Sequence, residues 1–176
     1  NFPSPSFVRQ IENQNLHALN IPELTIITPA ALQTEAERVA QLHREEGLTV
    51  AVIEQEKIFN EFSSGTPDAS AYRRLMKMFY DRAEGNENVR PRYLLLFGDG
   101  SYNNRKSMEK LHSPECNMLL TYQSKTSIDE RESFVIEDYF GFLEDNSGEE
   151  IKVDKVCLGI GRFPISSIKN ARLVVD

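Results

Sequence analysis

The sequence predicts an α/β fold in which helices cover both faces of a mainly parallel sheet, giving three layers. The first observation is that short apolar or β-branched runs alternate with amphipathic segments between Leu24 and Phe97, which is the order of a β-α-β-α-β unit. The second is the uninterrupted apolar run Tyr93–Phe97 (YLLLF), which is typical of a strand buried on both faces. Strands in this order are expected to be parallel, with right-handed crossovers.

The first strand, helix and second strand follow from local patterns. Leu24–Thr28 (LTIIT) predicts a strand, and Thr28-Pro29 then suits a helix start, because proline is favoured in the first helical turn. Gly47 is a suitable residue to end that helix. Leu48–Ile53 (LTVAVI) predicts the second strand. The helix between them carries apolar or partly apolar side chains near one face at Leu32, Ala36, Val39, Ala40 and His43.

The second strand is followed by a short apolar turn, a loop and a second helix. The apolar turn contains Ile58, Phe59 and Phe62, and the loop is Ser63–Pro67. Asp68 is then placed to cap the second helix. This helix leads to the third strand, Tyr93–Phe97. Its apolar side chains recur at helical spacing at Tyr72, Leu75, Met76, Phe79 and Ala83.

The pattern loosens after the third strand. Ser101–Pro114 is polar and predicts a loop, and a short strand is expected near Asn117–Tyr122. Ser124–Glu132 is charged and predicts an exposed connection. Phe134–Leu143 (FVIEDYFGFL) is partly apolar, and Gly141 within it indicates a bulge or a close approach of another chain segment.

The last part of the chain predicts a turn, a strand and a helix. Asp145–Gly148 is the turn, and Lys155–Ile160 (KVCLGI) is the strand. Ser166–Asp176 opens like a helix, with Ser166 or Ser167 as its N-cap, and no residue that ends a helix follows. Residues 24–176 are therefore expected to be a domain cut inside its last helix. Residues 1–23, which precede the first predicted strand, are expected to be a linker or the end of a preceding domain.

Composition excludes several classes of function. The net charge is −7 and the pI is near 5.1, and no stripe of lysine and arginine is present, so a nucleic-acid partner is not expected. No stretch approaches the roughly 18 apolar residues that span a bilayer. Cys116 and Cys157 form neither a disulfide framework nor a CxxC metal site.

The end of the third strand is the main candidate site. Gly98-Asp99-Gly100 places a carboxylate where ligands collect in open α/β sheets. A non-catalytic binding module that uses Asp99 is one hypothesis; in the alternative, Asp99 only caps the next turn. A serine hydrolase that uses Ser101 is another hypothesis, although a glycine stands where its nucleophile would be. The pairs Gly98/Gly100 and Gly159/Gly161 lack the third glycine of a dinucleotide-binding motif.

The histidines and cysteines give weak indications. His17, His43 and His112 have no partner at metal-ligand spacing, and His43 suits the end of a helix. Cys116 is four residues from His112, so a Cys/His dyad is one hypothesis, but such dyads are usually assembled from separate strand ends. Cys157 alternates within an apolar strand, which indicates a small core residue.

The acidic loop Glu144–Glu150 offers oxygen ligands of the kind that calcium prefers. It does not match the spacing of an EF-hand, and a solvated hairpin tip is the simpler interpretation. A calcium site becomes reasonable if folding brings the loop beside Asp99. In the alternative, Lys152 or Lys155 supplies the compensating positive charge.

Three segments together resemble a known family: Tyr93–Asp99 (YLLLFGD), Glu137–Leu143 (EDYFGFL) and Gly159–Pro164 (GIGRFP) followed by a helix. In this order they are similar to gingipain-type cysteine peptidases, especially to the sortase-like peptidases of the type IX secretion system in Bacteroidetes. The resemblance covers about Leu24–Asp176. It implies a caspase-like unit with two α/β subdomains, of which this chain matches the first.

The resemblance places the catalytic residues outside this chain. In that family the His and Cys of the dyad lie in the second subdomain, and no position here matches either one. The parent protein would be a cell-surface or outer-membrane cysteine endopeptidase. Its partners would be the downstream catalytic subdomain, cargo proteins with C-terminal secretion signals that it cleaves and helps attach to surface lipopolysaccharide, and other type IX secretion components.

The family resemblance also implies a calcium site on the first subdomain. Its carboxylate corresponds to Asp99, and a main-chain oxygen corresponds to a position near Glu144. The remaining ligands lie in a loop whose length differs here, so Asp145, Asn146 and Glu149 are only candidates. Ca2+ is thus the one cofactor that the resemblance implies.

Overall fold

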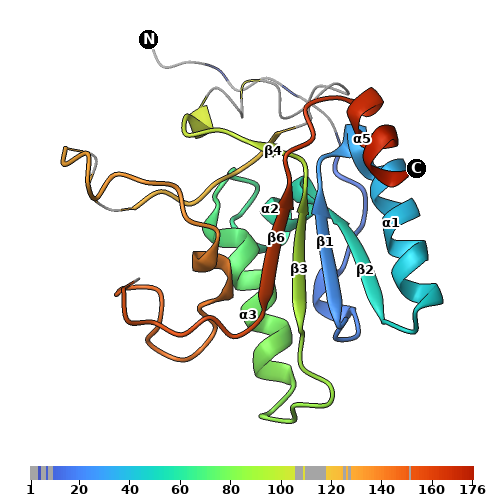
Figure 1. The fold of residues 1–176 in the computed structure, drawn as a ribbon, viewed down its shortest axis with the longest axis horizontal. Helices are drawn as coiled ribbons and strands as arrows, with labels where there is room; N and C mark the ends of the chain where they lie inside the picture. The colour runs from blue at the N-terminus through green and yellow to red at the C-terminus, as the bar shows by residue number, and fades with distance from the viewer. Residues whose placement is uncertain are drawn as a thin grey trace.

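A computed structural model of the chain describes residues 4, 7, 10–105, 109, 118–124, 126, 128–150 and 152–176. Its centre is a sheet of four parallel strands in the order β2-β1-β3-β6 (Figure 1). Leu24 of β1 is in register with Val50 of β2 on one side and Tyr93 of β3 on the other. The strands are β1 (Leu24–Thr28), β2 (Val50–Glu54), β3 (Tyr93–Phe97) and β6 (Gly159–Phe163).

Helices pack on both faces of the sheet, which confirms the predicted three-layer α/β fold (Figure 1). One face carries the 3-10 turn η2 (Ala30–Leu32), α1 (Gln33–Glu45) and α5 (Ile168–Val175). The other carries α2 (Gln55–Phe62), α3 (Ser70–Arg82) and the 3-10 turn η3 (Asp138–Gly141). A second, two-stranded parallel sheet joins β4 (Asp99–Gly100) to β5 (Met118–Leu119). No helix within the described residues is long and apolar enough to cross a membrane.

Local hydrogen bonds explain where the predicted helices begin and end. Gly47 has a φ of +95°, and its N–H donates to the carbonyl of Arg44 at 3.0 Å, so this glycine ends α1 as predicted. The carboxylate of Asp68 accepts from the N–H of Ser70 at 2.8 Å and thereby begins α3. The hydroxyl of Ser167 accepts from the N–H of Asn170 at 3.1 Å and caps α5.

Helix α2 and the last strand, β6, differ from the sequence-based prediction. The expected apolar turn at Ile58 is a full helix, α2, and it begins at Gln55. Gln55 is buried because its amide accepts from the hydroxyl of Tyr72 at 2.7 Å and donates to the carbonyl of Met118 at 2.8 Å. The last strand begins at Gly159 and not at Lys155, since the N–H of Cys157 donates to Gly141 in η3 at 2.8 Å. The preceding residues are thus held outside the sheet.

The core has one cluster on each face of the sheet. The cluster beneath α2, α3 and η3 holds the largest buried side chains, and β1, β2 and β3 contribute Ile27, Ile53 and Leu96. The cluster beneath α1 and α5 is smaller and includes Ile26 and Phe97. Buried aromatic side chains of the larger cluster are Phe59, Tyr72, Phe79, Phe140 and Phe142.

Part of the segment assigned to a linker packs against α2. Leu16 is only 8% exposed, and its N–H donates to both carboxylate oxygens of Glu61, at 2.7 and 2.9 Å. His17 also pairs with Glu61, at 2.7 Å. Burial opposes the charge of Glu61, but hydrogen bonds from Leu16, Gln14 and His17 outweigh it and hold its pKa below the ordinary value. The chain therefore joins the folded domain before Leu24.

One buried hydroxyl leads to a stability prediction. The Oγ1 atom of Thr25 is buried in β1 and has no hydrogen-bond partner among the described residues. Thr25→Val keeps the side-chain shape and removes this polar atom, so we expect the free energy of unfolding to rise by about 1 kcal/mol in urea denaturation.

Thr28→Val is the matched control for this prediction. The hydroxyl of Thr28 donates to the carbonyl of Phe97 at 3.2 Å, so its removal should lower the free energy of unfolding by about 1 kcal/mol. A loss of stability in Thr25→Val equal to that in Thr28→Val would contradict the assignment.

Candidate functional site

The candidate site lies at the carboxyl end of β3, where the chain leaves the main sheet. The N–H of Gly98 donates to Phe163 and that of Asp99 donates to Ile165, both at 3.1 Å. The chain then enters β4, which pairs with β5 above the sheet (Figure 1). The carboxylate of half-buried Asp99 accepts from the N–H of Gly100 at 2.8 Å. Asp99 thus bonds within its own turn, which is the alternative that the sequence left open.

Arg162 of β6 holds this end of the sheet together. Its guanidinium donates to the carbonyls of Gly98 and Asp99 at 3.2 Å and to that of Leu120 at 3.0 Å. Its Nε donates to Oε1 of Glu137 at 2.7 Å. The Arg162 side chain is 12% exposed and that of Glu137 is 27% exposed, so the ion pair is largely shielded from water. One side chain therefore fixes β4, β5 and the start of η3 relative to β6.

Sequence reasoning did not identify Arg162 or Glu137 as site residues. Two features of the sequence could have indicated them. Arg162 is the single charged residue in the run GIGRFP, and Glu137 directly precedes the segment that forms η3. The Oε2 atom of Glu137 is buried and makes no hydrogen bond with the described residues.

The loop after β4 packs closely against the segment after β5. A Cβ atom at Gly100 would lie 2.8 Å from the methyl group of Thr121 and 3.2 Å from the guanidinium carbon of Arg162, so only glycine fits. The Thr121 hydroxyl donates to the carbonyl of Ser101 at 2.8 Å, and the Asn104 side chain bonds to both backbone groups of Thr121. The strand end is therefore rigidly built.

The geometry does not favour a serine nucleophile. The hydroxyl of Ser101 accepts from the N–H of Asn103 at 3.0 Å. Of the two histidines in the described part of the chain, His17 pairs with Glu61 at 2.7 Å and His43 with Glu46 at 2.8 Å. Neither is available to activate Ser101. His112 and Cys116 lie outside the described residues.

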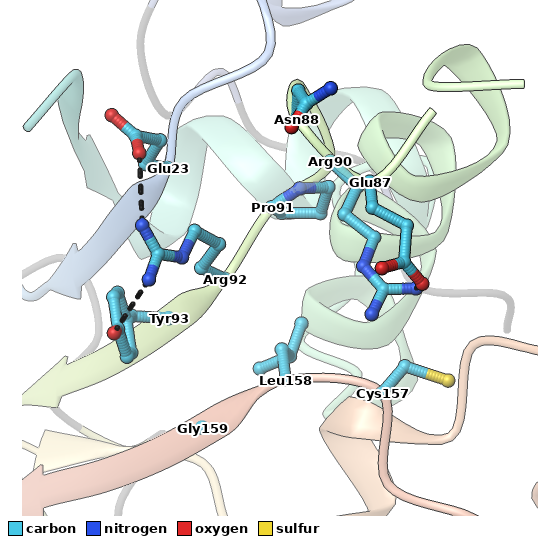
Figure 2. Close-up of a pocket in the computed structure, with 10 residues that line it drawn as sticks. All are labelled: Glu23, Glu87, Asn88, Arg90, Pro91, Arg92, Tyr93, Cys157, Leu158 and Gly159. Atoms are coloured by element: carbon cyan, nitrogen blue, oxygen red, sulfur yellow. Dashed lines mark hydrogen bonds and ion pairs between the residues drawn. The ribbon is translucent and has the colours of Figure 1, made fainter. Parts of the chain in front are cut away.

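Cys157 lies at the opposite, amino end of the sheet. It lines a cavity of about 550 Å³ with Arg90, Arg92, Leu158 and Gly159 (Figure 2). It is half-buried at the edge of the larger core cluster, in partial agreement with its prediction as a core residue. Burial and then the neighbouring thiol raise the pKa of the Tyr80 hydroxyl.

The charged side chains that line this cavity pair with their neighbours. Figure 2 shows the guanidinium of Arg92 between Glu23 and the hydroxyl of Tyr93, each at 3.4 Å. Arg90 pairs with Glu87 at 3.3 Å. A hydrogen bond from the backbone of Thr49 is the main reason why the pKa of Glu23 is lowered. The arrangement contains no nucleophile held by a base.

Two cationic side chains of α3, Lys77 and Arg73, bind the acidic loop. Lys77 pairs with Asp145 at 2.9 Å, which lowers the pKa of that carboxyl. Arg73 donates to the carbonyls of Phe142 and Ser147 at 2.7 Å. The compensating positive charge therefore comes from Lys77 and Arg73, whereas Lys152 pairs with Glu132 at 3.1 Å.

The candidate calcium ligands do not form one cluster. Asp99 bonds to its own turn and Asp145 pairs with Lys77, while Glu144 and Glu149 are exposed. In the ranges that the structure describes, no group of three or more His, Cys, Asp or Glu side chains is placed to hold a metal ion. These side chains alone do not fit a calcium ion.

Calcium binding stays a prediction from the family resemblance, and thermal melts test it. A site of useful affinity that includes Asp99 should raise the melting temperature, because only the folded chain presents the site. At a calcium concentration one hundred times the Kd, the free energy of unfolding rises by about 2.7 kcal/mol. Asp99→Asn should lose most of this shift. Equal melting temperatures in millimolar calcium and in chelator, for both proteins, would mean that Asp99 serves only as a turn cap.

Comparison with known proteins assigns the family. Residues 17–176 match the model of peptidase family C25. The chain is also similar to the crystal structure of dimeric latent PorU from Porphyromonas gingivalis, with a TM-score of 0.80 and 43% sequence identity. This match covers 94% of the present chain and 16% of the PorU chain. No curated protein matches the sequence. The chain therefore belongs to peptidase family C25, the gingipain family of cysteine peptidases.

Proposed function

We propose that this chain is the first, structural subdomain of a type IX secretion sortase. The single observation that carries the proposal is the 43% identity to PorU over 94% of the chain, since identity at this level extends beyond a shared fold. The parent protein is then a cysteine endopeptidase that removes C-terminal secretion signals from cargo proteins. It acts at the cell surface or outer membrane of a Bacteroidetes-type bacterium.

The catalytic step in the parent protein needs a thiolate and a base. A histidine accepts the proton of the cysteine, and the thiolate attacks the scissile carbonyl carbon. The C–N bond breaks as the histidine returns the proton to the leaving amine, and water then hydrolyses the acyl-enzyme to release the acid and the free thiol. In our proposal both groups belong to the following subdomain. This chain contributes a rigid wall, in which Arg162 and Glu137 hold the loops at the carboxyl end of the sheet.

Deletion of the gene in the source bacterium tests the proposed function. We expect cargo proteins to retain their C-terminal signals, and a gene copy that encodes the wild-type protein should restore their removal. Intact-mass measurement of secreted cargo reads this directly. Normal removal of the signals in the deletion strain would contradict the sortase role.

A further inference from the structure

One face of β3 and β6 is left open on the side of α1. On this side the described helices lie over β1 and β2 and over the carboxyl end of the sheet (Figure 1). The open face consists of five residues on this side of the two strands. Tyr93 is 40% exposed, Leu95 and Phe163 are half-buried, and Gly159 and Gly161 are exposed.

The open face is concave and predominantly apolar. It forms a cavity of about 580 Å³ whose walls include Leu24 and Leu48 from the neighbouring part of the domain. Phe163 extends the surface toward Leu173 and Val174 on α5, which are 71% and 54% exposed. Val175, the last residue of the same helix, is partly buried against the smaller core cluster. A parallel sheet is normally covered on both faces, and no described part of the chain covers this surface.

Gly161 indicates that the cover comes from outside the described domain. A Cβ atom at Gly161 would meet no atom within 4 Å, and no positive φ requires glycine there. At Gly141, by contrast, a Cβ atom would collide with the side chains of Val156 and Ile160. A glycine in a strand that neither packing nor backbone conformation requires suits the close approach of another backbone.

We propose that the open face is the seat of an amphipathic α-helix from another domain of the same polypeptide. Helices cover the faces of parallel sheets, whereas an added strand would pair at the edge. Gly159 and Gly161 allow the helix to lie close to β6, and Tyr93, Leu95 and Phe163 receive its apolar side chains. Arg92 at the rim, held to Glu23 at 3.4 Å, can face a carboxylate of the helix.

The similar PorU chain supports this choice of occupant. The present chain covers only 16% of it, so a relative of the same family carries a large amount of additional polypeptide. The proposal rests on the proposed function, in which this subdomain packs against a following one. It adds the surface, the residues and the type of element that meets them.

Thiol labelling at position 161 tests the proposal. Gly161→Cys in a Cys116→Ser, Cys157→Ser background is treated with a maleimide, both in the isolated chain and in the full-length protein. In the isolated chain we expect it to react as fast as Lys152→Cys, an exposed control whose native side chain is 78% exposed. In the full-length protein its rate should fall by at least about tenfold while that of the control does not.

Two results would overturn the proposal. Equal rates at position 161 in the isolated and full-length proteins would show that nothing covers the open face. Slow labelling in the isolated chain that becomes fast on dilution would show that a second copy covers it instead. Signal removal by the wild-type protein is measured separately, so a failure here is distinguishable from a failure of the proposed function.

Footprinting of the unmodified protein provides a second measurement that needs no variant. Hydroxyl radicals should oxidise Tyr93 readily in the isolated chain, because its side chain is accessible. In the full-length protein we expect Tyr93 to be protected, whereas exposed Tyr102 (56%) serves as the internal reference. Undiminished oxidation of Tyr93 in the full-length protein would overturn the proposal independently.

Discussion

Replacement of Arg162 by methionine is expected to lower the free energy of unfolding by about 3–5 kcal/mol, because it leaves the carboxylate of Glu137 in a largely shielded position without its partner. The substitution also removes the donors to the carbonyls of Gly98, Asp99 and Leu120. Urea denaturation of the isolated chain measures the loss. The domain is therefore expected to be destabilised more by this change than by loss of any exposed ion pair.

Two further variants separate the stability lost with the Arg162–Glu137 ion pair from the stability lost when any arginine is removed. Arg172→Met removes an arginine that is 65% exposed. Its partner Glu35, at 3.2 Å, is 7% exposed but keeps Arg38 at 2.8 Å, so the expected change is below about 1 kcal/mol. The double variant Arg162→Met/Glu137→Leu should recover part of the loss, since no charge is then left unpaired. If Arg162→Met proved as mild as Arg172→Met, the role assigned to Arg162 would be wrong.

Substitution of Gly141 by alanine is the second change with a large expected effect. The new Cβ atom would lie 2.8 Å from Cγ1 of Val156 and 2.9 Å from Cδ1 of Ile160. These side chains must shift to admit the new atom. We therefore expect the free energy of unfolding to fall by about 1–3 kcal/mol, and by more in Gly141→Val. The melting temperature should fall accordingly.

Gly161→Ala is the matched control for Gly141→Ala. Both glycines have φ outside the left-handed region, but a Cβ at Gly161 meets nothing within 4 Å. In the isolated chain its substitution should be neutral or slightly stabilising, because alanine restricts the unfolded chain more than glycine does. Equal melting temperatures for the two alanine variants would contradict the close packing of η3 on β6.

The sequence predicted correctly those elements whose position depends on residues within the element itself. β1 and β3 were predicted at their observed bounds, because a β-branched run and an apolar run, with the proline or glycine that follows each, are visible in the sequence. Gly141 was predicted to mark a bulge or a close approach, and the structure shows a close approach, since a side chain there would meet Val156 and Ile160. Helix α2 was missed because Gln55 looks like a surface residue until Tyr72 and Met118 satisfy its amide.

The candidate site was predicted less completely than the fold. Asp99 was correctly placed at the strand end, and its bond to Gly100 is one of the two outcomes foreseen. The partners of Arg162 lie 25 to 64 residues away along the chain, so no local pattern predicts them. The same holds for Lys77, which pairs with Asp145 of the acidic loop across 68 residues.

Our proposal makes this chain the structural part of a cysteine peptidase and places the catalytic dyad in the following subdomain. The most direct test incubates the purified chain, and separately the full-length protein, with a library of peptides under reducing conditions. We expect cleavage by the full-length protein that a thiol blocker abolishes, and none by the isolated chain. Thiol-blocker-sensitive cleavage by the isolated chain would contradict the claim, and its loss in Cys116→Ala would then locate the nucleophile.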